Sequence, residues 1–75
     1  MPTFFIIEGV KICLFFDDHN PPHFHAFIAE YEAVIEIYSL EFIRGDLPKN
    51  KKQKILKWAE LNREELIEIW DDLNK

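Results

Sequence analysis

The spacing of apolar side chains changes once along this chain, from two residues in the first half to three or four in the second. In the first half the alternating positions are Val10, Ile12, Leu14 and Phe16 in one run and Ala33, Ile35 and Ile37 in another. This period is typical of strands with one buried face. In the second half the apolar positions are Ile55, Leu56 and Ala59, then Leu66, Ile67, Trp70 and Leu73. These follow the spacing of a buried helix face. The chain therefore predicts an α+β fold, with a small antiparallel sheet of about four strands followed by two C-terminal helices packed on one face.

Turn-forming residues divide the predicted strands. Glu8-Gly9 predicts a hairpin between residues 3–7 and 10–16, and Pro21-Pro22 ends the second strand because neither proline can donate to a sheet. Further strands are expected at 23–28 and 31–38, with a short extended stretch around Leu40 to Ile43. The length of 75 residues favours a single domain, with residues 1–46 forming the sheet and 47–75 the helical part.

A break in the helical region is predicted near residues 61–62. Asn62 followed by Glu65 matches a capping box, and Leu61 with Leu66 matches a hydrophobic staple. One continuous helix is the competing interpretation.

All three histidines of the chain, His19, His23 and His25, fall within seven residues, directly after Asp17 and Asp18. Imidazole titrates near neutral pH and is the commonest protein metal ligand, so the cluster suggests proton transfer, metal binding or phosphate contact. The competing interpretation is that these rings only pack against their aromatic neighbours.

The alternation of a strand places His23 and His25 on one face. In a hairpin with 31–38, a turn at 29–30 sets His23 opposite Glu36, and a turn at 30–31 sets His25 there. This arrangement suggests a catalytic set in which His23 or His25 is the general acid or base and Glu36 orients the imidazole. A second hypothesis is a site for a divalent ion such as zinc, with His19, His23, His25 and Asp18 (or Asp17) as ligands.

Charge is segregated along the chain, whose net charge is −5. Five lysines and no acid lie within residues 49–58, namely Lys49, Lys51, Lys52, Lys54 and Lys57. Such a segment can bind phosphate or an acidic partner, or can be an ordinary solvated helix face. The acidic remainder argues against general nucleic-acid binding, so nucleic acid is at most a second ligand.

The small size and the two tryptophans, Trp58 and Trp70, predict self-association or a small cognate protein partner. The single cysteine, Cys13, lies in a strand-like apolar run and indicates a reducing, cytoplasmic compartment. The apolar start is interrupted by Glu8 and Lys11, so neither a signal peptide nor a membrane span is expected.

Motifs distributed along the whole chain resemble a known bacterial family, domain of unknown function 4160. They are Met1-Pro2-Thr3, Gly9, Asp18-His19, Pro21-Pro22-His23-Phe24-His25, Tyr31-Glu32-Ala33, Gly45-Asp46-Leu47-Pro48, Trp58-Ala59-Glu60-Leu61, Glu65-Leu66 and Trp70. The signature positions of the family correspond here to Asp18, His19, Pro22, His23, Phe24 and His25. The resemblance implies a small cytosolic protein, often encoded beside another small protein in an arrangement that suggests a toxin–antitoxin pair. Ala29-Glu30 departs from the glycine-rich turn often found in such proteins.

Three functions are consistent with these features. The first is a partner-binding module of a toxin–antitoxin-like pair, with a histidine-rich surface site. The second is a small nuclease that uses His23 or His25, with the lysines holding phosphate. The third is a metal-binding domain that uses His19, His23 and His25.

Overall fold

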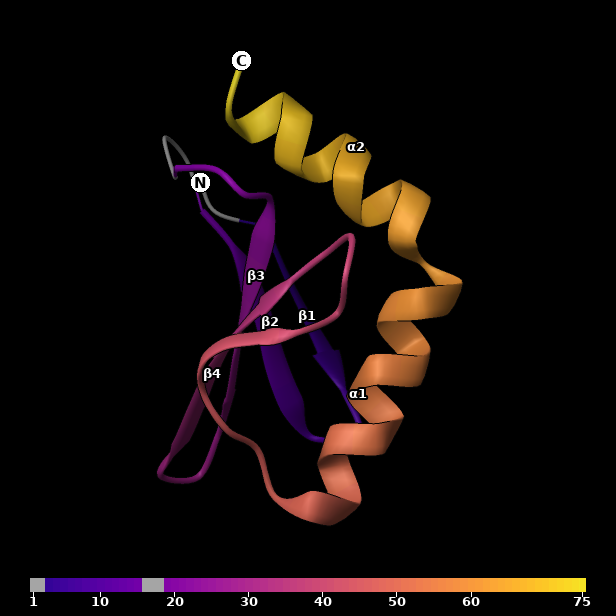
Figure 1. The fold of residues 1–75 in the computed structure, drawn as a ribbon. Helices are drawn as coiled ribbons and strands as arrows, with labels where there is room; N and C mark the ends of the chain where they lie inside the picture. Colours follow the sequence, from indigo (N-terminus) through magenta and orange to yellow (C-terminus); the bar gives the residue numbers. More distant parts are fainter. Residues whose placement is uncertain (1–2, 16–18) are drawn as a thin grey trace.

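A computed structural model describes residues 3–15 and 19–75 of the chain (Figure 1). Five strands precede two helices: β1 (Thr3–Ile7), β2 (Val10–Leu14), β3 (His23–Ile28), β4 (Tyr31–Glu36), β5 (Phe42–Gly45), α1 (Lys49–Leu61) and α2 (Arg63–Leu73). The strands form one antiparallel sheet in sequence order, from β1 at one edge to β5 at the other. The predicted α+β class is therefore confirmed.

The expected number of about four strands was wrong, because the extended stretch after Leu40 pairs with β4 as a fifth strand. This strand has only four residues, and its register shifts between Val34 and Ile35 on its neighbour. A short edge strand with an irregular register carries little of the two-residue alternation that identifies the others.

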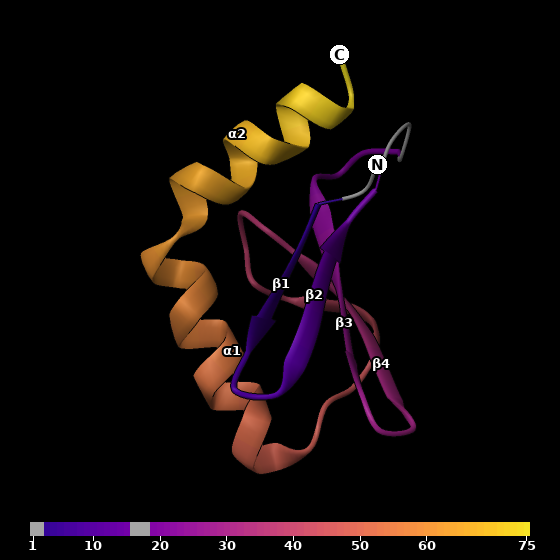
Figure 2. The same cartoon turned by 180° about the vertical axis from the view of Figure 1, so that it is seen from behind.

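Both helices lie on the same side of the sheet, so one sheet face is covered and the other is not (Figures 1 and 2). The core between sheet and helices consists of Val10, Ile12, Leu14, Phe24, Ala26, Ala33, Ile35, Ile37, Leu47, Ile55, Ala59, Leu66 and Trp70. Trp58 joins the layers by edge-to-face contacts with Phe5, at a ring-centroid distance of 5.6 Å, and Phe24, at 6.2 Å. Burial of these apolar groups is the main force that holds the helices to the sheet.

The hairpins set the positions of all side chains on the uncovered face. Glu8 and Gly9 connect β1 and β2 with φ angles of 54° and 79°, which are typical of a two-residue hairpin turn. Ala29 and Glu30 connect β3 and β4, so His23 lies opposite Glu36, the first of the two expected registers. Ala29 also has a positive φ, 52°, a conformation that glycine adopts more readily than alanine.

The predicted break between the helices is confirmed, and the single continuous helix is excluded, because α1 ends at Leu61 and α2 begins at Arg63. The predicted capping box does not form, since Asn62 makes no side-chain bond to the start of α2. Its side-chain amide instead donates to the Trp58 carbonyl at 2.8 Å, which satisfies an end carbonyl of α1. Leu61 is 73% exposed and so provides no staple.

Polar contacts fix the helices to the sheet. The Asp46 carboxylate accepts hydrogen bonds from the Lys52 ammonium and the Leu47 amide, both at 2.9 Å, and these two bonds lower the pKa of Asp46. At the start of α2, the Arg63 Nε donates to the Ile37 carbonyl at 3.1 Å. Within the described residues, no helix combines the length and the hydrophobicity needed to cross a membrane.

Candidate functional site

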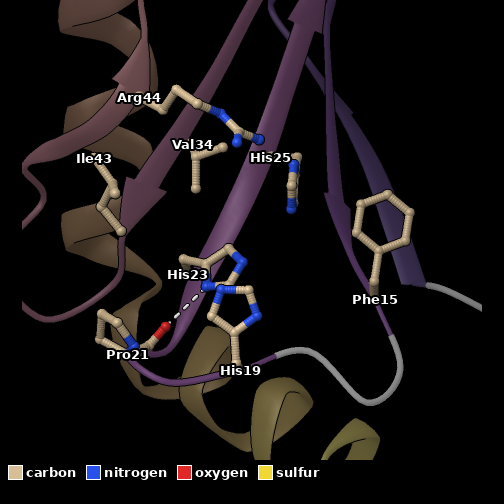
Figure 3. Close-up of a pocket in the computed structure, with 8 residues that line it drawn as sticks. All are labelled: Phe15, His19, Pro21, His23, His25, Val34, Ile43 and Arg44. Atoms are coloured by element: carbon tan, nitrogen blue, oxygen red, sulfur yellow. Dashed lines mark hydrogen bonds between the residues drawn. The ribbon is translucent and has the colours of Figure 1, made fainter.

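A pocket of about 530 Å³ opens on the uncovered face of the sheet (Figure 3). Its walls are formed by Phe15, His19, Pro21, His23, His25, Val34, Ile43 and Arg44. Side chains from β3, β4 and β5 and from the segments that follow β2 and precede β3 therefore meet here. The volume lies within the range of about 300–1,000 Å³ that small-molecule sites occupy.

Cross-strand pairing explains why residues distant in sequence meet in this pocket. Cys13, His25, Val34 and Arg44 are successive partners on β2, β3, β4 and β5. Partners directly opposite each other in an antiparallel sheet share a face, so this row runs across the uncovered side. Cys13 is buried within the row, and this burial raises the pKa of its thiol.

His23 is held in place at the end of the sheet. Its side chain is only 5% exposed, and its Nδ1 donates to the Pro21 carbonyl oxygen at 2.8 Å. The ring also lies 5.0 Å from the Trp70 ring, measured between centroids. The hydrogen bond to a carbonyl places the proton of the neutral ring on Nδ1. His23 thus has a packing role, whatever further role the ring has.

His25 and His19 are more accessible than His23. The half-buried His25 ring meets Phe15 edge-on at 4.8 Å and lies parallel to Phe27 at 6.2 Å. His19 is exposed, and its ring centroid lies 6.0 Å from that of His23, which in turn is 5.2 Å from His25. The structure therefore brings all three predicted histidines to one pocket.

The predicted metal set is only partly within the described residues, since Asp17 and Asp18 lie outside them. Among the side chains that the structure describes, no group of three or more His, Cys, Asp or Glu residues is arranged to hold a metal ion. A metal site that includes Asp18 stays a prediction.

The predicted lysine segment lies on α1, and none of its five lysines lines the pocket. Lys52 pairs with Asp46, and its ammonium also lies 4.8 Å from the centre of the Phe42 ring. Lys54 pairs with Glu8 at 3.3 Å, while Lys49 and Lys57 are exposed and Lys51 is half-buried. The structure does not bring this segment together with the histidines.

The cation of the pocket is Arg44, which sequence reasoning missed. Arg44 lies opposite Val34 on β5, and its side chain reaches across Val34 toward His25 (Figure 3). Its guanidinium makes no hydrogen bond or ion pair with any residue that the structure describes. A predicted strand that continued two residues past Ile43 would have included Arg44 and so placed it in the sheet.

Exposed apolar side chains on the uncovered face gather at the opposite edge of the sheet. Phe4 and Ile6 on β1 are 57% and 60% exposed. Trp70, one of the two tryptophans from which self-association or a partner was predicted, is 3% exposed and belongs to the core, so its ring offers no binding surface. Trp70 is buried because the second helix lays its apolar stripe against the sheet.

The fold and the pocket define a small α+β domain with a one-sided sheet and a histidine-lined cavity on its uncovered face. The chain belongs to the family described as domain of unknown function 4160, whose model matches residues 9–71. No curated protein and no solved structure matches the chain.

Proposed function

We propose that this protein is a cytoplasmic partner-binding module, one member of a toxin–antitoxin-like pair, and that its partner docks along β1 on the uncovered face. The observation that carries the proposal is the exposure of Phe4 and Ile6, at 57% and 60%, on an edge strand. Large apolar side chains exposed together at an open edge are favoured binding surfaces.

The alternation of β1 separates its two faces. Phe5 and Ile7 point to the helices and pack against the core, whereas Phe4 and Ile6 point away from it. The Lys11 ammonium lies 5.1 Å from the centre of the Phe4 ring and covers part of it. Covering the remaining surface would contribute on the order of 1 kcal/mol for each of these two side chains.

The backbone of β1 offers a second mode of contact. Within the part of the chain that the structure describes, β1 pairs with β2 on one side and with no strand on the other. An unpaired strand edge can accept a strand from another protein, whose main chain supplies hydrogen bonds while its side chains meet Phe4 and Ile6. A small protein with a free strand fits this edge.

Family context supports a cognate protein as the occupant. The family resemblance implies a small protein encoded beside this one, and the buried core of a protein–protein interface is apolar and enriched in aromatic residues such as Phe4. The buried, unpaired Cys13 supports a reducing compartment for the pair.

The test is co-expression of this chain with the product of the neighbouring gene, followed by measurement of the dissociation constant. Ile6→Glu should weaken the complex about tenfold or more, because it places a charge in the interface. Leu61→Glu is the matched control, since Leu61 is also a largely exposed apolar side chain, at 73%, but lies at the helix junction.

Equal effects of the two variants, or the absence of a complex, would contradict the proposal. A homodimer that Ile6→Glu disrupts would contradict the choice of partner, because a second copy of the chain would then occupy β1.

The catalytic alternative rests on the register that sets His23 opposite Glu36. Because His23 is buried and its Nδ1 is hydrogen-bonded to the Pro21 carbonyl, His25 would be the histidine that contacts a substrate directly. This alternative stays a prediction.

A further inference from the structure

We infer that the pocket beside Arg44 binds a nucleoside monophosphate, with the phosphate on the guanidinium and the base against the apolar walls. This inference does not depend on the proposed partner, because the pocket is built from the β3–β5 side of the sheet and Phe4 and Ile6 lie on β1.

Arg44 provides the anion-binding group. Its guanidinium stands at the pocket with no hydrogen bond or ion pair among the described residues, although a guanidinium carries five donors in a planar fork. This fork matches the oxygens of a phosphate, with which it forms paired, charge-assisted hydrogen bonds. A guanidinium without an ion pair among the described residues thus points into the pocket (Figure 3).

The other walls suit a planar base. Phe15 presents an aromatic ring, and Val34 and Ile43 line the pocket with aliphatic groups. Base-aromatic stacking is a common means of holding a nucleobase. An inorganic anion alone would leave this apolar surface uncovered.

The imidazole of His25 lies between Arg44 and Phe15, and that of His19 lines the pocket beside His23 (Figure 3). Their signals in nuclear magnetic resonance spectra also report directly on a ligand in this pocket.

The experiment is calorimetric titration of the full-length protein with adenosine monophosphate, adenosine and inorganic phosphate in parallel. The nucleotide should bind with the highest affinity and should shift the imidazole resonances of His25 and His19. Arg44→Gln should weaken binding of the nucleotide about tenfold or more, since it removes the charge-assisted bonds. Lys75→Gln is the matched control, because it removes the same charge from a side chain that is 80% exposed and lies outside the pocket.

Phe15→Leu tests the aromatic wall separately. It should weaken binding of the nucleotide while leaving the weaker binding of inorganic phosphate unchanged. The inference is overturned if adenosine binds as tightly as its monophosphate, if millimolar nucleotide does not bind, or if Arg44→Gln and Lys75→Gln have equal effects. Thermal unfolding of each variant verifies that the substitution leaves the protein folded.

Discussion

At the scale of single residues, the histidines have different physical environments although they lie within one short window. His23 is buried against Trp70 and donates to the Pro21 carbonyl, whereas His19 is exposed. A buried ring contributes more packing to the folded state than an exposed ring does.

We therefore predict that His23→Ala lowers the free energy of unfolding by about 2 kcal/mol, because it removes ring packing and leaves the Pro21 carbonyl without its donor. His23→Phe should lose less, since it keeps a ring beside Trp70. Urea denaturation followed by tryptophan fluorescence measures both. His19→Ala is the control and should change stability by less than about 0.5 kcal/mol. A loss for His19→Ala as large as that for His23→Ala would show that burial does not distinguish the two rings.

Strand alternation alone predicted that His23 and His25 share one face, and it left two registers for Glu36 because the turn position was open. It could not predict the burial of His23, which depends on the contact with Trp70, 47 positions further along the chain. Arg44 was missed for the same reason, since its place at the pocket depends on the pairing of β5 with β4.

At the scale of elements, Gly45 controls how closely β5 approaches β4. Gly45 has a φ of 74° and lies beside Ala33, and a β-carbon at this position would overlap the backbone carbonyl of Glu32. The next residue donates its amide to that same carbonyl, at 3.2 Å. Only glycine combines this conformation with so close an approach of two backbones.

Gly45→Ala should consequently destabilise the fold by about 3 kcal/mol, from the strained φ together with the backbone clash. Gly9→Ala is a matched control, because Gly9 has a similar φ of 79° but open space around it. It should cost only the conformational strain, about 1 kcal/mol. Thermal or urea unfolding of the two variants gives the comparison, and a cost for Gly9→Ala equal to that for Gly45→Ala would refute the close-approach argument.

Sequence reasoning located the helices and the break between them well, because apolar spacing and polar residues at the junction are local signals. The capping box was wrong because the Asn62 amide has two helix ends within reach and bonds the carbonyl of Trp58. Which end is satisfied depends on the backbone angle between the helices, and no local pattern encodes this angle.

At the scale of the whole molecule, the sheet is covered by helices on one face only (Figures 1 and 2). The uncovered face carries two separate features, the apolar edge at Phe4 and Ile6 and the histidine-lined pocket beside Arg44. The helices carry most of the segregated charge, with lysines on α1 and acids on α2. The proposed partner surface and the proposed ligand pocket therefore both lie on the face that the helices leave open.

The most direct test of this account is amide hydrogen exchange in β1, measured for the protein alone and for its complex with the product of the neighbouring gene. The account predicts that the amides of residues 4–6 exchange about tenfold more slowly or more in the complex, because a docked partner protects the open edge of the strand. Amides of α1 around Ile55 should exchange at unchanged rates, since the helices face away from the proposed interface. Slower exchange confined to α1 or α2, with β1 unaffected, would contradict the claim that the uncovered sheet face binds the partner.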